Sequence, residues 1–408
     1  MSRNTLIRIW IVAIVSSAGG QVTLRAQVEP FAVTLDQPVN GKVTLSPTLP
    51  PDGKYPGGTK LTVTATPDAG YAFDSGYYSV PGRWGAMYYE SMTNPFTITV
   101  DRDQRIGASF IETKALKGFR VIQDVVYAQP GVKPLKYDVY APDGANKLPC
   151  IVIIHGGGWS TNTEDIMRGL ARELVKTNRY VVCSIDYRWL GTLDGDEIPN
   201  TMIDLIEDVF GAIAHIQEHA EEYGADPGRL AVTGDSAGGH LSAVAANMVN
   251  MIGEGGEGVF EYRPTYMPSG KTAQHVRTAM AKAIKAAAPS YGVFDSDSLR
   301  QFVSDVPDGW LKAIAPIENI PNVQERAVPQ LLLRGTADML IRNEPVQAYA
   351  DALKAAGQTV EYVQVEGANH AFFDWKPDRR TKETFAKYGV PYAAKMRSFF
   401  DAVFYAKP

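Results

Sequence analysis

The 408-residue sequence has little cysteine, no surplus of basic charge and no long apolar run. Its two cysteines allow at most one disulfide. The formal net charge of −5 argues against nucleic acid as a partner, because phosphate binding requires a basic surface. Hydrophobic residues make up 45% of the chain, which is enough for a large core and more than one domain.

The N-terminal segment 1–26 is expected to be a cleaved secretory signal. Arg3 and Arg8 form a basic start, residues 9–15 form a short apolar core, and Leu24-Arg-Ala26 offers a small-residue cleavage site. The alternative is a membrane anchor, but the apolar run is far shorter than the ~20 residues needed to span a bilayer. We therefore expect a secreted, periplasmic or cell-surface bacterial protein without stable membrane insertion after cleavage.

Two glycine-containing motifs carry the strongest chemical signal. Gly234-Asp-Ser-Ala-Gly238 fits a nucleophile elbow, in which a sharp turn between a strand and a helix exposes Ser236. The motif follows the strand-like run 230–233 and precedes the helix-like run 240–246, which is the context it requires. Upstream, His155-Gly-Gly-Gly-Trp159 is a turn whose bare backbone N–H groups can approach a developing oxyanion.

The base that would activate Ser236 is found by elimination among only six histidines. His370 follows the strand-like run 360–365 on a loop, from which it can reach a serine on a neighbouring loop. The acid is expected between the serine and the histidine. Asp338 fits best, because it leaves the apolar run 330–334 in the loop Gly335-Thr-Ala-Asp338. Two further carboxylates, Glu344 and Asp295, remain as alternatives.

These motifs together resemble an α/β-hydrolase of the hormone-sensitive-lipase-like esterase group, from about Lys114 to Pro408. The resemblance is carried by the motifs above together with Asp186-Tyr-Arg188 and Gly367-Ala-Asn-His370. It implies an eight-stranded, mostly parallel sheet, a Ser–His–Asp mechanism and no cofactor. It also implies oxyanion donors from the backbone of Gly157, Gly158 and Ala237.

The same resemblance makes the strands that contain Cys150 and Cys183 parallel neighbours. Counted back from the two strand ends, the cysteines stand about two residues out of register. A disulfide would be strained there, so we expect buried free thiols.

The segment between the signal and the hydrolase, residues 27–113, is expected to be a small β-rich domain. Leu61 to Thr66 and Phe96 to Val100 alternate as half-buried strands do. The segment resembles one divergent InlB-type B repeat, through residues that include Tyr55-Pro-Gly-Gly-Thr59, Gly70-Tyr-Ala-Phe73 and Ile106-Gly-Ala-Ser-Phe110. A spacer is favoured, and the alternative is a surface or glycan contact through its aromatics, Tyr77, Tyr78, Trp84, Tyr88 and Tyr89.

Two connections are candidates for a cap over the serine, Asn250 to Ala273 and Ser290 to Pro329. The candidate pocket residues are three tryptophans, Trp159, Trp310 and Trp375, and simple packing is the competing interpretation. No metal is expected. His215-Ile-Gln-Glu-His219 matches an inverted zinc motif, but its helix is explained by the fold and no third ligand is obvious.

The sequence thus predicts a secreted serine carboxyl-ester hydrolase acting on a small-molecule or polysaccharide ester. Among enzymes that resemble this group, the secretory signal and the added β-rich domain suggest feruloyl or acetyl esters of plant polysaccharides as substrates. The alternatives are a general short-chain carboxylesterase or lipase-like enzyme and, in another class, a non-catalytic surface-binding protein on a hydrolase scaffold.

Overall fold

The computed structural model describes residues 9–10, 27–82, 85–255, 260–303, 306 and 308–406. The chain divides into two compact units, residues 1–117 with 376–378, and residues 118–375 with 379–408. The expected signal segment 1–26 lies outside the described residues, apart from Ile9 and Trp10. In the part of the chain that is described, no helix is both long and apolar enough to cross a membrane.

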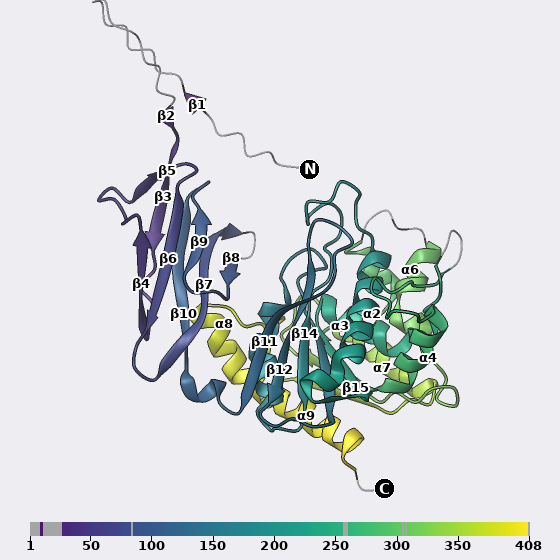
Figure 1. Cartoon of the computed structure of the whole chain (residues 1–408). Helices are drawn as coiled ribbons and strands as arrows, with labels where there is room; N and C mark the ends of the chain where they lie inside the picture. Colours follow the sequence, from purple (N-terminus) through teal and green to yellow (C-terminus); the bar gives the residue numbers. More distant parts are fainter. Residues whose placement is uncertain are drawn as a thin grey trace, which may run out of the picture. The chain divides into compact units, whose positions relative to one another are not determined.

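The first unit is built of β-strands (Figure 1). One sheet has five strands in the order β5-β3-β10-β7-β8 and another has three in the order β4-β6-β9. Alternate side chains of β6 are buried, and Leu61 and Val63 join Phe96 and Ile98 in one hydrophobic cluster. The predicted β-rich N-terminal domain is therefore confirmed. Its strands are β3 (Pro30–Leu35), β4 (Gly41–Ser46), β5 (Lys54–Pro56), β6 (Lys60–Pro67), β7 (Tyr71–Gly82), β8 (Gly85–Ser91), β9 (Phe96–Thr99) and β10 (Gln104–Glu112); β1 (Ile9–Trp10) and β2 (Gln27–Val28) pair separately.

The four tyrosines of the candidate contact surface form two pairs across β7 and β8. Tyr78 and Tyr89 stack with ring centroids 4.7 Å apart, and Tyr77 meets Tyr88 edge-on at 5.3 Å. Tyr77 is buried, whereas Tyr89 is 41% exposed. The fifth aromatic, Trp84, lies outside the described residues.

The second unit contains an eight-stranded sheet in the order β11-β12-β14-β13-β15-β16-β17-β18. The first two strands pair antiparallel, β12 pairs antiparallel with β14, and every later pairing is parallel. This is the eight-stranded, mostly parallel sheet that was predicted. The strands are β11 (Phe119–Ala128), β12 (Leu135–Pro142), β13 (Leu148–Ile154), β14 (Val181–Ile185), β15 (Ala225–Asp235), β16 (Ile284–Ser290), β17 (Gln330–Gly335) and β18 (Val360–Val365).

Helices cover this sheet, as the buried central strands require. Helices α1 and α9 contact each other, whereas α2 contacts α3 and α4. The helices are α1 (Arg168–Val175), α2 (Met202–His219), α3 (Ala237–Asn247), α4 (Ala273–Ala283), α5 (Ser296–Arg300), α6 (Asp308–Ile314), α7 (Asn343–Ala355), α8 (Arg379–Thr384) and α9 (Val390–Phe404).

The two cysteines are free and fully buried, as expected. Cys150 pairs with Val181 and Val152 pairs with Cys183, which is the predicted two-residue offset. The sulfur atoms are 3.8 Å apart, far longer than a disulfide bond.

Candidate active site

Ser236 stands at the turn between β15 and α3 with φ of 52° and ψ of −115°. A positive φ is uncommon for a residue other than glycine, and such strain often marks a functional turn. The Ser236 N–H donates to the Ser290 carbonyl at the end of β16, at 3.0 Å. Gly238 is required because a Cβ atom there would lie 1.9 Å from the Ile154 carbonyl oxygen. This is the strand–turn–helix context that the motif predicted.

The structure brings Ser236, His370 and Asp338 together in one hydrogen-bonded chain. The distance from Ser236 Oγ to His370 Nε2 is 2.9 Å, and that from His370 Nδ1 to Asp338 Oδ2 is 2.8 Å. Because an ionised carboxylate only accepts, Nδ1 carries the ring proton, which leaves the Nε2 lone pair facing the serine hydroxyl. The imidazole is therefore placed to take a proton from Ser236.

Asp338 is 4% exposed and its second oxygen is also occupied. Oδ1 accepts the backbone N–H groups of Leu340 and Ile341, each at 2.9 Å. Burial alone would raise the pKa of Asp338. The hydrogen bond and charge of His370, together with these N–H groups, outweigh it and lower the pKa below its ordinary value. The side chain is therefore held ionised next to the imidazole.

The two alternative acids lie in other settings. Asp295 caps α5 by accepting the Ser298 N–H at 2.8 Å, and Glu344 lies in the first turn of α7. No contact between either carboxylate and His370 is among the hydrogen bonds of the described residues. The geometry thus favours Asp338, as the sequence did.

The glycine turn after β13 has the open backbone expected of an oxyanion site. Gly157 has φ of 121° and Gly158 has φ of 60°, and a Cβ atom on Gly157 would lie 2.3 Å from the Thr161 carbonyl oxygen. Ala237 is the first residue of α3, so its N–H stands at the positive end of a helix. Gly157, Gly158 and Ala237 are the residues whose backbone N–H groups the family resemblance implied as oxyanion donors, and that role stays a prediction.

Sequence reasoning missed the roles of the groups that hold this turn. Asp235 Oδ1 accepts the Gly156 N–H at 2.7 Å, which ties the glycine turn to the elbow. His155 Nε2 lies 3.2 Å from Asp186 Oδ1, which also receives Lys133 Nζ at 2.9 Å. Asp186 and Asp235 both lie in motifs that the sequence shows. Their contacts could not be predicted, because Asp186 lies beside a residue 31 positions away in sequence and Asp235 binds one 79 positions away.

The three candidate pocket tryptophans lie in different surroundings. Trp159 is 2% exposed and meets His240 and Phe302 edge-on. Trp375 packs against Phe385 and against Gly169 of α1.

Trp310, on α6, is 40% exposed, and its ring centroid lies 5.3 Å from that of Phe260. The last contact joins the two connections that were proposed as caps.

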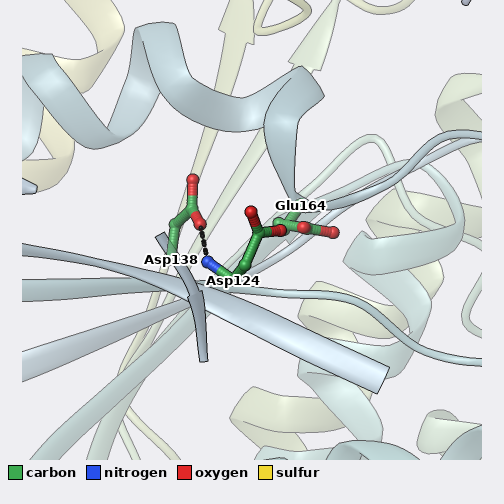
Figure 2. Close-up of side chains that lie close together, drawn as sticks. All are labelled: Asp124, Asp138 and Glu164. Atoms are coloured by element: carbon green, nitrogen blue, oxygen red, sulfur yellow. Dashed lines mark hydrogen bonds between the residues drawn. The ribbon is translucent and has the colours of Figure 1, made fainter. Parts of the chain in front are cut away.

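A cluster of carboxylates lies at β11, β12 and the short helix Glu164–Met167 (Figure 2). The Asp124 N–H donates to Asp138 Oδ1 at 3.0 Å, and Glu164 completes a set whose oxygens lie within 4.8 Å of one another. Lys136 Nζ contacts Asp124 and lies 3.4 Å from Glu164 Oε1. The chain's own ammonium group thus supplies the cation here, and the absence of a required metal stays a prediction.

Two acids of this cluster hold protons more tightly than usual. Burial, followed by repulsion from Asp165, raises the pKa of Asp138 to about 7. Burial, followed by repulsion from Asp186, raises the pKa of Glu164 to about 8. In both cases water no longer solvates the charged form. The folded protein therefore binds protons that the unfolded chain releases between about pH 4.5 and about pH 8.

We expect Glu164→Gln to weaken the loss of stability that accompanies rising pH. A folded-state pKa above the unfolded value gives stability that is present at low pH and lost as pH rises through the folded pKa. Glutamine cannot ionise, so the Tm of the variant minus that of the wild type should increase between about pH 5 and about pH 8. Thermal unfolding measures this difference, with the exposed Glu318→Gln as the control. A constant difference across that range would show that Glu164 is already ionised at the lower pH.

Comparison with known proteins assigns both units to families. Residues 151–374 match the family described as alpha/beta hydrolase fold, and residues 31–114 match the divergent InlB B-repeat domain. The first match covers more than half of the chain, so the chain belongs to the alpha/beta hydrolase fold family. The resemblances predicted from the motifs are confirmed for both parts of the chain.

Relatives of this family include proteins named as esterases. Esterase LipQ of Mycobacterium tuberculosis is 30% identical over 270 residues, which are 61% of this chain and 56% of that protein. Carboxylesterase NlhH of the same species is 30% identical over 250 residues, 59% of this chain and 72% of that protein. Thermogutta terrifontis esterase 2 phosphoramylated by tabun matches with a TM-score of 0.53 and 25% identity, over 72% of this chain and 97% of that chain. The chain spans about half the length of the first of these relatives.

Proposed function

We propose that this protein is a serine carboxyl-ester hydrolase. The observation that carries the proposal is the continuous chain of hydrogen bonds from Ser236 Oγ through His370 to Asp338. A nucleophile, a base within hydrogen-bond reach and an acid that orients the base are the three parts that acyl transfer requires. The esterase names of the relatives support the same chemistry.

In the first half of the reaction, Ser236 Oγ attacks the ester carbonyl carbon while His370 Nε2 takes the hydroxyl proton. The carbonyl oxygen becomes an oxyanion that accepts the N–H groups of Gly157, Gly158 and Ala237. Collapse of this intermediate breaks the bond to the alcohol oxygen, and His370 returns the proton to that oxygen. The alcohol leaves, and the acyl group stays on Ser236.

In the second half, water replaces the alcohol. His370 takes a proton from the water as its oxygen attacks the acyl carbon, and the same donors hold the second oxyanion. Collapse releases the carboxylic acid and returns the proton to Ser236. Asp338, whose pKa is lowered, keeps the imidazole in the required tautomer throughout.

For the substrate we propose feruloyl or acetyl esters of plant polysaccharides. The expected secretory signal and the added β-rich domain favour a polymer outside the cell. The aromatic side chains of the two candidate cap connections, Asn250 to Ala273 and Ser290 to Pro329, can stack on a phenolic or sugar ring. Export to the periplasm, the cell surface or the medium, and a glycan contact through the β-rich domain, belong to the same proposal.

The second candidate is a general short-chain carboxylesterase. It is favoured by one specific observation, since Thermogutta terrifontis esterase 2 was solved with butyrate bound and matches with a TM-score of 0.51 and 25% identity. The third alternative, a non-catalytic surface-binding protein on a hydrolase scaffold, has no supporting observation in the site, because all three triad groups are present and in contact.

A substrate panel at matched enzyme concentration separates these candidates. We expect hydrolysis of methyl ferulate or acetylated xylan, and poor hydrolysis of a long-chain triglyceride. Preference for the triglyceride, or activity confined to short p-nitrophenyl esters, would overturn the polysaccharide proposal and leave the esterase mechanism standing. Absence of activity on every ester would overturn the esterase proposal itself.

A further inference from the structure

One carbonyl group in the glycine turn accepts two hydrogen bonds. The Gly156 oxygen lies 2.7 Å from His155 Nδ1 and 3.2 Å from Asn162 Nδ2. Because a carbonyl oxygen only accepts, both side-chain nitrogens donate to it. Two donors therefore fix the direction in which this carbonyl group points.

The same peptide carries a proposed oxyanion donor. The Gly156 C=O and the Gly157 N–H belong to one planar trans peptide, in which the two groups point in opposite directions. Holding the oxygen therefore aims the N–H at its target. Hydrogen bonds in series also polarise one another, so donation to the Gly156 oxygen makes the Gly157 N–H a stronger donor.

Asn162 is held in place for this task. Its φ of 71° lies in the left-handed region, which asparagine adopts more readily than most residues. The Asn162 carbonyl accepts the indole N–H of Trp189 at 2.9 Å. Its side-chain nitrogen lies only 2.8 Å from the position that a Cβ atom on Gly157 would occupy, so it packs directly on the donor residue.

We propose that Asn162 is a positioning residue, which orients and polarises the Gly156–Gly157 peptide so that its N–H stabilises the oxyanion. The inference rests on the proposed esterase function and adds a residue to that mechanism. Asn162 does not touch the reacting atoms, and it acts only through the peptide. Its contribution is made when the oxyanion forms, so it lowers the barrier of the chemical step and leaves substrate binding unchanged.

Two variants distinguish the effect of the Asn162 side-chain amide from the effect of its left-handed backbone. Asn162→Gly keeps the left-handed backbone and removes the donor, whereas Asn162→Asp keeps the size and places a carboxylate against the Gly156 oxygen. Loss of a whole oxyanion donor costs about 10²- to 10³-fold in kcat, so we expect about tenfold for Asn162→Gly and about 10²-fold for Asn162→Asp. KM should stay within about twofold in both, because the lost stabilisation belongs to the transition state.

Asn178→Gly is the matched control. Asn178 also has a left-handed backbone, with φ of 57°, but it is exposed in the turn after α1. This variant should keep the wild-type kcat and KM for p-nitrophenyl acetate. The Tm of every variant shows whether the fold is retained, and Asn162→Gly decides the outcome if Asn162→Asp does not fold.

The affinity for an alkyl trifluoromethyl ketone is a second measurement, which should not change if Asn162 has only a structural role. Attack by Ser236 converts it into a tetrahedral adduct whose oxyanion occupies the same site, so its affinity should fall in parallel with kcat/KM. Wild-type kcat and ketone affinity in both Asn162 variants would overturn the inference while the esterase function stands. The inference would also be overturned if the Asn162 variants changed only KM, or if Asn178→Gly lost as much kcat as they do. A wild-type protein that hydrolyses no ester would overturn both.

Discussion

Replacement of Ser236 by alanine is expected to lower kcat for a soluble ester by about 10⁶-fold. The alanine methyl group cannot attack the carbonyl carbon, and His370 Nε2 loses the hydroxyl that lies 2.9 Å away. A small residual rate should remain, because the backbone donors still stabilise an oxyanion when water attacks. Release of p-nitrophenol from the acetate ester measures the loss.

The matched control is Ser242→Ala on α3. Ser242 is also buried and donates to the Gly239 carbonyl at 3.0 Å, but it has no part in the proposed chemistry. This variant should keep most of the wild-type activity. Retention of more than about a hundredth of the wild-type kcat in Ser236→Ala would contradict the assignment of the nucleophile.

The second large effect is expected at Asp338, where replacement by asparagine should lower kcat by about 10⁴-fold. The Leu340 and Ile341 N–H groups bind Oδ1, so the asparagine oxygen must stay there to accept them. The amide NH₂ group then faces His370 Nδ1, which must give up its proton to accept. The proton moves to Nε2, and the imidazole can no longer take a proton from Ser236.

Steady-state kinetics of Asp338→Asn, Glu344→Gln and Asp295→Asn measure this effect together. The last two variants should stay close to the wild type, because Glu344 lies in the first turn of α7 and Asp295 caps α5. A near-normal kcat in Asp338→Asn with a loss in Glu344→Gln would move the acid to Glu344.

The triad could be predicted from the sequence because each member follows a strand of the same sheet. Ser236, Asp338 and His370 come after β15, β17 and β18, which all run parallel. The carboxyl ends of parallel strands meet at one edge of a sheet, so loops distant in sequence converge there. The order of the motifs along the chain was therefore enough to predict that the three side chains lie close together.

The offset of the two cysteines was predictable for a related reason. Pairing of neighbouring parallel strands fixes a register, and counting from the strand ends gave the two-residue offset that β13 and β14 have. By contrast, no pattern pointed to the contact of Lys136 with Asp124 and Glu164, because it depends on how a side chain from β12 reaches β11 and a short helix.

The bonds that hold the glycine turn could not be predicted either. The Asn162 contact with the Gly156 oxygen depends on a left-handed backbone at Asn162, and asparagine permits that conformation without requiring it. The edge-on contact of the buried Trp159 with Phe302 was likewise not predictable, because Phe302 comes from a connection without a regular sequence pattern. Local patterns predict elements, whereas loop conformations depend on packing between segments distant in sequence.

The central claim is that Ser236 is an activated nucleophile, and covalent labelling with a fluorophosphonate tests it most directly. The serine oxygen displaces fluoride at phosphorus, and the adduct adds a fixed mass that peptide mapping locates. The wild-type protein should be labelled once, on the peptide containing Ser236, and Ser236→Ala should remain unlabelled. A wild-type protein that does not react, or that carries the label on another residue, would contradict the account.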